Sequence, residues 1–445
     1  MVPGPKTASD AIRLPTALEW PALQPPRVRV AYLARYTAGG SALSLQTLVE
    51  ALDREQYEAV ILCHALRDPG WAAALEAAQV PVIGLVAPWR AARPGLSELN
   101  LNARLRSDGL PGLIRRTRGT VRAVEGLLRL DWRWQPALAR QLRRLRPALV
   151  HCNNGLRAHR LDILLCRMLG LPVICHVRNF EALSAVERLA ARGVWRFIYI
   201  SRAIAADFER QGIPARRGEV IPNALSEGAL APAAPVARTE LGCGPEHYLV
   251  ANVGRLVPWK GQDMFLRAIA QAARRLPQVR ALIVGAADDN DRSRAFAAEL
   301  HALANSLGLA QQVIFTGHRP DVQSVMAAAD VVVHTAVTPE PFGRVLIEAL
   351  AAGCPVIAAG AGGVLEILEH EVTGLIVPPN DSQALADSLL RLAADPALRA
   401  RLGAAGRQQA SLRFNAPEHA RQVTALYRLA LDASAARDGG AARPG

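Results

Sequence analysis

Two glutamates, Glu340 and Glu348, stand eight residues apart in the stretch TPEPFGRVLIEALAAGCPVIA, residues 338–358. The stretch predicts a loop after a strand, then a short helix closed by Gly353 and Pro355, and then a new strand. The glutamates therefore flank a helix N-terminus, whose N–H groups and positive dipole end suit an anion such as a diphosphate. Because carboxylates repel a diphosphate, we expect them to accept hydrogen bonds from the neutral hydroxyls of a sugar and a ribose.

Cations suited to a diphosphate occur in the segment VGRLVPWKGQD, which carries Arg255 and Lys260 in a loop after another predicted strand. Arginine offers a planar fork of donors, and lysine offers a point charge. The chain has two lysines, Lys6 and Lys260, and the other 50 of its 52 basic residues are arginines. A lysine is therefore conspicuous at position 260, and we expect it to have a specific role.

The elements around these residues are typical of parallel α/β domains. Short apolar runs alternate with amphipathic segments over residues 26–228 and again over 246–415. The 445 residues are also more than one core usually holds. We therefore predict an α/β fold of two Rossmann-like doubly wound domains that face each other across a cleft, with ligands at the carboxyl ends of the strands.

The domain boundaries follow from changes in composition along the chain. The predicted units are a disordered leader at 1–25, an N-terminal domain at 26–228, an Ala- and Pro-rich linker at 229–245, a C-terminal domain at 246–415, a C-terminal helix at 416–434 that crosses back to the N-terminal domain, and a disordered tail at 435–445. An Arg-rich insertion, at about residues 86–146, interrupts the N-terminal domain.

The insertion interleaves arginines with leucines and with Trp132 and Trp134, and it contributes to the formal net charge of +13. Such a pattern is typical of amphipathic helices that lie on an anionic membrane, but ordinary surface helices have the same pattern. Both interpretations stay open. We do not expect nucleic acid as a partner, because no aromatic platform or known binding module accompanies the charge.

The location of the protein is indicated by its cysteines and its apolar segments. The six cysteines lie mostly in apolar runs without a metal-binding spacing, which predicts buried free thiols in a reducing compartment. The first 25 residues lack the apolar core of a secretory signal, and no window approaches the roughly 18 apolar residues of a spanning helix. We expect a cytoplasmic protein, with peripheral contact to the inner face of the cytoplasmic membrane as an open alternative.

Four segments, GRLVPWKGQD, FTGHRPDV, EPFGRVLIEALAAGCPVIA and GLIVPPNDSQAL, resemble the retaining glycosyltransferases of the GT-B fold, family 4, also called glycosyl transferases group 1. The resemblance is close over residues 248–430 and looser over 27–228. It implies a bacterial hexosyltransferase that moves a sugar from a UDP- or GDP-sugar to a glycan or lipid-linked acceptor, in the synthesis of a cell-surface polysaccharide or glycolipid. It also implies retention at the anomeric carbon, with no metal and no other cofactor.

The resemblance also implies roles for particular side chains. Arg255 and Lys260 match the pair that holds the donor diphosphate and stabilises the leaving group. Glu340 matches the residue that holds hydroxyls of the transferred sugar, and Glu348 the residue that holds the ribose. His176 matches a histidine near the sugar, although a hydrogen-bonded core histidine is the alternative.

Other positions match the family through their backbone or their place beside the donor. Arg319 corresponds to residues beside the nucleotide base, while Gly39 and Gly40 resemble a loop that closes on the diphosphate, where glycine allows a near approach. The backbone groups implied to line the sugar and phosphates belong to Phe342, Gly343, Arg344 and Val345.

Two features depart from the family pattern. Asn223 is followed by Ala224 where the family usually has glycine, and a positive φ at alanine would cost energy. The sequence DDND at 288–291 contains a D-x-D triplet that could hold a divalent metal, but we interpret it as the cap of the following helix. Two alternatives to a transferase stay open, namely a sugar-nucleotide epimerase of the same fold and a non-catalytic sugar or polyanion binder.

Overall fold

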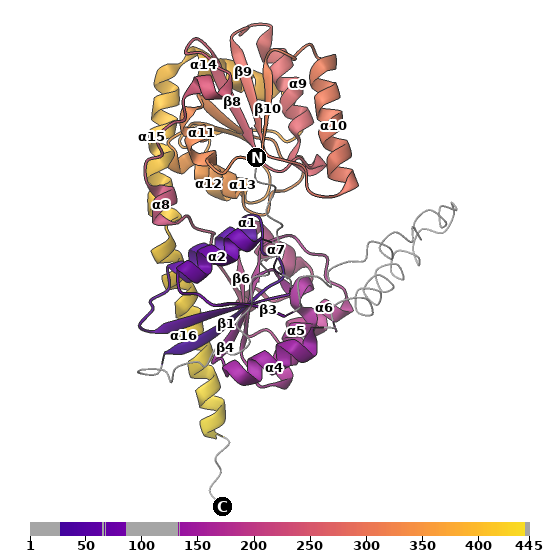
Figure 1. Ribbon diagram of the computed structural model, residues 1–445, viewed down its shortest axis with the longest axis vertical. Coiled ribbons are helices and arrows are strands. Elements are labelled where there is room, and N and C mark those ends of the chain that lie inside the picture. The colour runs from indigo at the N-terminus through magenta and orange to yellow at the C-terminus, as the bar shows by residue number, and fades with distance from the viewer. Residues whose placement is uncertain (1–26, 65, 67, 86–131, 133, 441–445) are drawn as a thin grey trace, which may run out of the picture.

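The computed structural model describes residues 27–64, 66, 68–85, 132 and 134–440. Two α/β domains are stacked along the long axis, and a long C-terminal helix runs down beside the N-terminal one (Figure 1). Each domain is built on its own parallel sheet. The predicted fold of two Rossmann-like domains is therefore confirmed.

The N-terminal sheet has seven parallel strands in the order β3-β2-β1-β4-β5-β6-β7. Its strands are β1 Val28–Ala34, β2 Tyr57–Cys63, β3 Val82–Gly84, β4 Leu149–Cys152, β5 Val173–Val177, β6 Arg196–Tyr199 and β7 Gly218–Val220. Its helices are α1 Gly40–Glu50, α2 Pro69–Ala77, α4 Gln135–Leu145, α5 Leu156–Met168, α6 Ala185–Ala191 and α7 Arg202–Arg210. The strand order reverses between β1 and β4, which is where such sheets bind ligands.

The C-terminal sheet has six parallel strands in the order β10-β9-β8-β11-β12-β13. The strands are β8 Tyr248–Val253, β9 Val279–Val284, β10 Val313–Gly317, β11 Val331–His334, β12 Val356–Ala359 and β13 Leu375–Val377. The helices are α9 Gln262–Ala273, α10 Asp291–Ser306, α11 Val322–Ala328, α12 Arg344–Ala351, α13 Val364–Ile367, α14 Ser382–Ala394 and α15 Pro396–Arg413.

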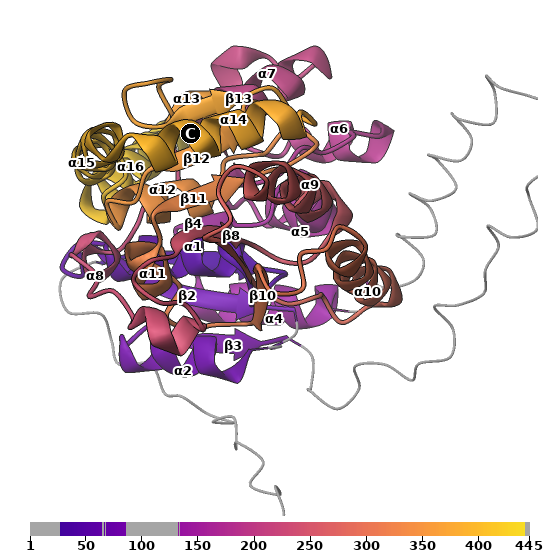
Figure 2. The same ribbon diagram turned by 90° about the horizontal axis from the view of Figure 1, so that it is seen from above.

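Helices cover both faces of each sheet, which explains why the central strands read as continuous apolar runs. All four residues of β11 are buried, as are all four of β12. Figure 2 shows α9 and α10 on one side of the C-terminal sheet and α11 and α12 on the other. One hydrophobic cluster continues from the N-terminal domain into the C-terminal one, so the two domains are packed against each other.

The C-terminal helix, α16 Ala416–Gly440, crosses back to the N-terminal domain as predicted. Its Tyr427 is fully buried, donates to the hydroxyl of Tyr32 at 3.0 Å and lies 2.6 Å from Nδ1 of His151. The helix continues six residues beyond the predicted end at 434 (440 − 434), because the segment AARD that follows consists mostly of good helix formers. The first residues assigned to the disordered tail at 435–445 are thus helical.

Two segments differ from their sequence interpretation. The predicted linker at 229–245 begins within the short helix α8, Glu227–Leu230, and its residues Leu241 and Cys243 are buried. The end of the Arg-rich insertion forms α4, whose leucines 138, 142 and 145 are buried in the N-terminal core. That part is an ordinary packed helix, while residues 86–131 lie outside the described ones. The elements α2 and β3 were not predicted.

All six cysteines are buried and free, as expected from their apolar surroundings. In the described part of the chain, no helix combines the length and the apolar composition that a membrane span needs.

Candidate functional site

The centre of the candidate site is an ion pair between the two C-terminal sequence motifs that carry Lys260 and Glu340. Lys260 Nζ donates to Oε2 of Glu340 at 2.7 Å, and Nε2 of His334 lies 3.1 Å from the same oxygen. Lys260 follows β8, whereas His334 ends β11 and Glu340 lies in the loop after it. Because β8 and β11 are neighbouring parallel strands, the residues that follow them meet at one edge of the sheet.

The electrostatics of this cluster keep Glu340 ionised. Its carboxyl group is nearly buried, which by itself raises the pKa, but the His334 hydrogen bond and the Lys260 charge outweigh burial and hold the pKa at about 2. Burial lowers the pKa of His334, so its imidazole is neutral at physiological pH. The ammonium of Lys260 also lies 4.2 Å from the ring centroid of Trp259.

The Lys260 loop is held by close backbone packing. Gly261 has φ +67°, and a Cβ there would lie 2.1 Å from the carbonyl oxygen of Thr335. The Thr335 hydroxyl donates to the carbonyl of Lys260 at 2.9 Å and accepts from the amide of Asn252 at 3.1 Å. Only glycine fits this contact, so the sequence Lys-Gly places the lysine beside β11.

The Glu340 loop is held by a second glycine contact, from the segment after β12. Gly363 N donates to the carbonyl of Glu340 at 2.8 Å, and a Cβ on Gly362 would lie 2.3 Å from the same carbonyl. This GAGG segment, residues 360–363, was not singled out in the sequence. The role of these glycines can be recognised only once the position of the Glu340 loop is known.

Arg255 does not contact Lys260 or Glu340 directly. Its guanidinium is 58% exposed and pairs with Asp288 at 2.7 Å, while its carbonyl accepts from Gln262. An exposed pair of this kind contributes little to stability, so Arg255 is free to exchange Asp288 for another anion. Asp288 belongs to DDND, in which Asn290 caps α10 by accepting from the Ser293 amide, as the cap interpretation predicts.

Glu348 is paired with Arg344, one helical turn before it. Arg344 Nε donates to Glu348 at 2.8 Å, and its other nitrogen reaches the N-terminal domain, 3.3 Å from both the Ser44 hydroxyl and the Ala224 carbonyl. Burial raises the pKa of Glu348, although the Arg344 charge opposes the shift. The family resemblance indicated only the backbone of Arg344, so this side-chain contact between the domains was missed.

Three predicted glycines shape the surfaces beside these residues. Gly39 has φ +77° with open space at its Cβ position, and Gly40 lies 3.9 Å from Arg344 when a Cβ is added. Gly343, with φ +102°, precedes the first turn of α12. The β1–α1 loop and the α12 N-terminus therefore approach each other across the domain boundary.

The other predicted donor residues have clear structural partners. Arg319, in the loop after β10, forms a two-pronged ion pair with Asp321. The Phe342 ring is buried and packs edge-on against Phe414, so only its backbone can line a ligand. Val345 is half-buried beside the core.

His176 is fully buried in a polar network at the carboxyl end of β5. Its Nδ1 lies 3.3 Å from Nε2 of His151 and 3.3 Å from Arg178, which itself donates to Asn153 and Asn223. Burial and the Arg178 charge hold the pKa of His176 well below its usual value. The network is the hydrogen-bonded alternative considered for this histidine, and its contact with a sugar stays a prediction.

Arg178 and Arg344 bring two positive charges from different domains close together. Burial, with the nearby Arg344 charge, lowers the pKa of Arg178 to about 9. Two cations that disfavour each other indicate a place where an anion is stabilised.

The alanine at position 224, where the family usually has glycine, causes no backbone strain. Among the described residues, the only non-glycine positions with positive φ are 79, 146, 371 and 380.

Direct contacts also join the domains next to the site. The Ser201 hydroxyl donates to the Pro341 carbonyl at 2.7 Å, and Glu366 accepts from the first two amides of α7, Arg202 N and Ala203 N. A carboxylate suits a helix N-terminus because of its unpaired N–H groups. Neither contact was predicted, since each joins segments more than a hundred residues apart.

A known glycosyltransferase family matches each half of the chain. The family described as "Glycosyltransferase Family 4" matches residues 38–227, and the one described as "Glycosyl transferases group 1" matches residues 236–409. In structure, Anabaena HepE in complex with UDP and glucose superposes with a TM-score of 0.71 and 26% identity over 90% of this chain and all of that one. A sucrose-phosphate synthase from Thermosynechococcus elongatus shows the same fold, with a TM-score of 0.70 and 23% identity. The match covers 92% of this chain and all of that one.

Among curated relatives, a D-inositol 3-phosphate glycosyltransferase of Segniliparus rotundus is 39% identical over 219 residues, which is 48% of this chain and 47% of that protein. The lipopolysaccharide core biosynthesis glycosyltransferase LpsD of Rhizobium meliloti is 34% identical over 41% of this chain and 50% of its own length. The chain thus spans about half the length of the curated relatives it matches. With both of its domains matched by family models and the fold matched over nine tenths of its length, the chain belongs to the family 4-type glycosyltransferases of the GT-B fold.

Proposed function

We propose that the protein is a retaining glycosyltransferase that moves a sugar from a nucleotide-diphosphate sugar to a glycan or lipid-linked acceptor without a metal ion. The observation that carries the proposal is the cluster of Lys260, Glu340 and His334 beside the N-terminus of α12. It places a cation, an ionised carboxylate and a helix N-terminus at one edge of the C-terminal sheet. A diphosphate with a sugar attached needs these three groups.

The proposed chemistry relies on cations that stabilise the leaving diphosphate. Lys260 and the exposed Arg255 supply charge from the C-terminal domain, and Arg344 adds charge at the domain boundary. Preorganised charges aimed at a leaving group are often the largest contribution to catalysis. The acceptor attacks from the face that the diphosphate leaves, through an oxocarbenium-like ion pair, so no carboxylate nucleophile is needed. Glu340 holds sugar hydroxyls, and the packed domains exclude water.

Similar proteins indicate the substrate classes to test. HepE was crystallised with UDP-glucose and with UDP and glucose, which favours a UDP-sugar as donor over a GDP-sugar. The relatives named for D-inositol 3-phosphate and for the lipopolysaccharide core suggest a phosphorylated polyol or a lipid-linked saccharide as acceptor. We therefore place the reaction in the synthesis of a bacterial cell-surface glycan or glycolipid.

The test is a panel of UDP- and GDP-sugars given to the purified full chain with and without EDTA, with D-inositol 3-phosphate and a lipid-linked core saccharide as acceptors. We expect one nucleotide sugar to raise the melting temperature, to be hydrolysed slowly alone and to be transferred when an acceptor is present. Lys260→Ala should lose these responses, whereas Arg267→Ala, an exposed cation on α9, should keep them. The anomeric configuration of the product, read by NMR, tests retention.

Other outcomes would replace the proposal. Donor binding that requires a divalent metal and ignores Lys260 would contradict the metal-free site. A product that is an epimerised nucleotide sugar would identify an epimerase, and sugar binding without transfer or hydrolysis would identify a binding protein.

We also propose a cytoplasmic location with peripheral contact to an anionic membrane through residues 86–131. Because α4 is part of the core, a deletion that tests this must spare it and stay within residues 88–130. The deleted protein should lose flotation with anionic vesicles while keeping donor hydrolysis, and unchanged flotation would contradict the membrane role.

A further inference from the structure

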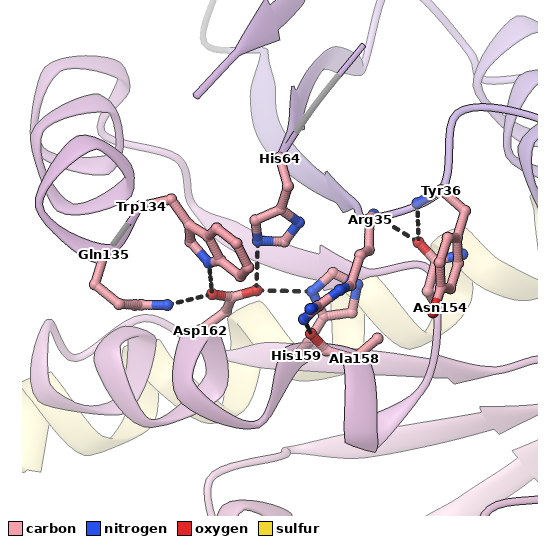
Figure 3. Close-up of polar contacts among 9 residues, drawn as sticks. All are labelled: Arg35, Tyr36, His64, Trp134, Gln135, Asn154, Ala158, His159 and Asp162. Carbon is pink, nitrogen blue, oxygen red and sulfur yellow. Dashed lines mark hydrogen bonds and ion pairs between the residues drawn. The ribbon is translucent and has the colours of Figure 1, made fainter. Parts of the chain in front are cut away.

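A second cluster of polar side chains lies in the N-terminal domain, away from the Lys260–Glu340 pair. His64 is the residue after β2, and His159 and Asp162 lie on α5. Figure 3 shows both imidazoles turned toward the Asp162 carboxylate, with Trp134 and Gln135 approaching it from α4. The side chains of the first three are 6%, 0% and 2% exposed, so the cluster is enclosed by protein.

The two oxygens of Asp162 have separate surroundings. Oδ1 accepts from Trp134 Nε1 at 3.3 Å and from Gln135 Nε2 at 2.6 Å. Oδ2 faces the histidines, at 2.8 Å from Nδ1 of His159 and 3.3 Å from Nε2 of His64. One oxygen is thus oriented by donors, and the other is directed at two imidazole nitrogens. Metal-binding carboxylates are typically oriented by outer hydrogen bonds of this kind.

Three of the four imidazole nitrogens of the cluster have no hydrogen bond, the exception being His159 Nδ1, which is bonded to Asp162. Within the described part of the chain, both ring nitrogens of His64 and Nε2 of His159 are buried without a hydrogen-bond partner. His64 Nε2 approaches Asp162 but lacks the alignment of a hydrogen bond. A buried polar atom without a partner is costly. An ion bound between His64 Nε2 and Asp162 Oδ2 would give the first of these nitrogens a partner.

Two of the donor separations can be compared with those around a small divalent metal. Ligands held at about 2.0–2.1 Å from a tetrahedral zinc ion are separated from each other by about 3.3 Å. The His64–Asp162 distance already has this value, and the His159–Asp162 distance needs to widen by about half an ångström. Among the described residues, this is the one set of three His, Cys, Asp or Glu side chains whose ligand atoms all lie within 4.8 Å of one another.

The backbone of α5 is also adapted at this position. His159 has φ −121° and ψ 16°, which is not helical and interrupts the first turns of α5. At this kink, Nδ1 of His159 faces Asp162, three residues later. Residues held away from regular backbone values often mark a functional constraint.

We propose that this cluster binds one divalent transition-metal ion of the zinc type, through His64 Nε2, His159 Nδ1 and Asp162 Oδ2, with water completing the coordination. Imidazole and carboxylate ligands suit zinc and its first-row neighbours. The ion ties the end of β2 to α5, and through Trp134 to the start of α4. Arg35 lies over the Trp134 ring at 5.0 Å and belongs to the loop that leads to Gly39, so the ion also supports that loop.

The site is separate from the proposed donor site and does not depend on it. The proposed metal supports the N-terminal domain, whereas the diphosphate is held by Lys260 and Arg255. EDTA is therefore expected to lower the melting temperature while leaving donor binding at room temperature intact. Donor binding lost in Lys260→Ala but kept in Asp162→Asn would separate the two sites.

The test uses the untagged full chain, stripped with EDTA, dialysed and titrated with zinc sulfate by calorimetry. We expect about one equivalent to bind and the melting temperature to rise. Cobalt chloride should give visible absorption bands of a low-coordinate nitrogen and oxygen site. His159→Gln and Asp162→Asn should each weaken zinc binding by about 100-fold or more.

The controls keep the test decisive. His370→Gln removes an exposed histidine of the C-terminal domain and should bind zinc like the wild type. Asp162→Asn keeps the size of the side chain and Oδ1, and circular dichroism checks that it folds. Absence of stoichiometric zinc and cobalt binding in the wild type, or equal binding in wild type, His159→Gln and Asp162→Asn, would overturn the proposal and leave the cluster as a hydrogen-bonded core.

Discussion

Lys260 Nζ lies 2.7 Å from Oε2 of Glu340, so the two side chains expected to hold opposite parts of a donor are paired with each other. Their strands, β8 and β11, are adjacent although 80 residues separate the two side chains. Glu340 keeps its charge through this pair and through His334. A donor that binds as proposed would meet an ammonium that already contacts the Glu340 carboxylate and the face of the Trp259 ring.

We expect Lys260→Met to reduce donor affinity and transfer by about 100-fold or more, because it removes a charge aimed at the diphosphate. It should also lower the free energy of unfolding by about 3 kcal/mol, since Glu340 is left buried with only His334 beside it. The double variant Lys260→Met, Glu340→Gln should recover most of that stability and none of the transfer. Urea unfolding and donor titration measure the two effects. Arg267→Met serves as the control, and a double variant as unstable as Lys260→Met would contradict the pairing.

The two glutamates are expected to change stability with pH in opposite directions. The pKa of Glu340 is lowered to about 2, so its contribution is present above the unfolded value of 4.5 and is lost as the pH falls toward 2. The pKa of Glu348 is raised by burial, so the cost of its charge is relieved as the pH falls toward 4.5. Unfolding of wild type, Glu340→Gln and Glu348→Gln between about pH 7 and pH 3 isolates each group. The free energy of unfolding of each variant is compared with that of the wild type at each pH. If the two differences change in the same direction as the pH falls, the assigned environments are wrong.

Gly261 and Gly308 offer a matched pair of left-handed glycines, with φ of +67° and +74°. A Cβ on Gly308 meets no atom within 4 Å, whereas one on Gly261 lies 2.1 Å from the Thr335 carbonyl. Gly308→Ala should cost about 1–2 kcal/mol of stability and leave donor affinity unchanged. Gly261→Ala should cost more and also weaken donor binding, because the Lys260 loop must move. Thermal unfolding and donor titration compare them, and equal donor affinity would show that the loop position is unimportant.

The meeting of Lys260 and Glu340 could be predicted from the sequence, because both residues lie in short segments at strand ends. Lys260 and Glu340 follow apolar strands, and parallel strands bring such loops to a common edge. His334 was missed because a histidine at the end of a buried strand gives the same signal as a core residue. The Gly362 contact was missed because a glycine shows no partner in a sequence.

The contacts between domains could not be predicted, because they depend on how two separately folded sheets are placed. Arg344 meets Ser44 across 300 residues of sequence. The helix α4 was assigned to the insertion because its arginines and leucines give the same amphipathic pattern on a membrane and on a sheet. Leu138 is completely buried in the N-terminal core, so α4 packs against the sheet.

Glu348 is expected to discriminate between ribose and deoxyribose in the donor. If its carboxylate accepts a ribose hydroxyl, the wild type should bind UDP about 10- to 100-fold more tightly than 2′-deoxy- or 3′-deoxy-UDP, the range for a hydrogen bond to a charged group. Glu348→Gln keeps the shape of the side chain beside Arg344 but lacks the charge, so this preference should largely disappear through weaker binding of UDP itself. Glu299→Gln, an exposed change on α10, controls for the lost charge. A preference for ribose that survives in Glu348→Gln would show that the ribose binds elsewhere. The role of Glu348 would then be to hold Arg344 in its contact between the domains.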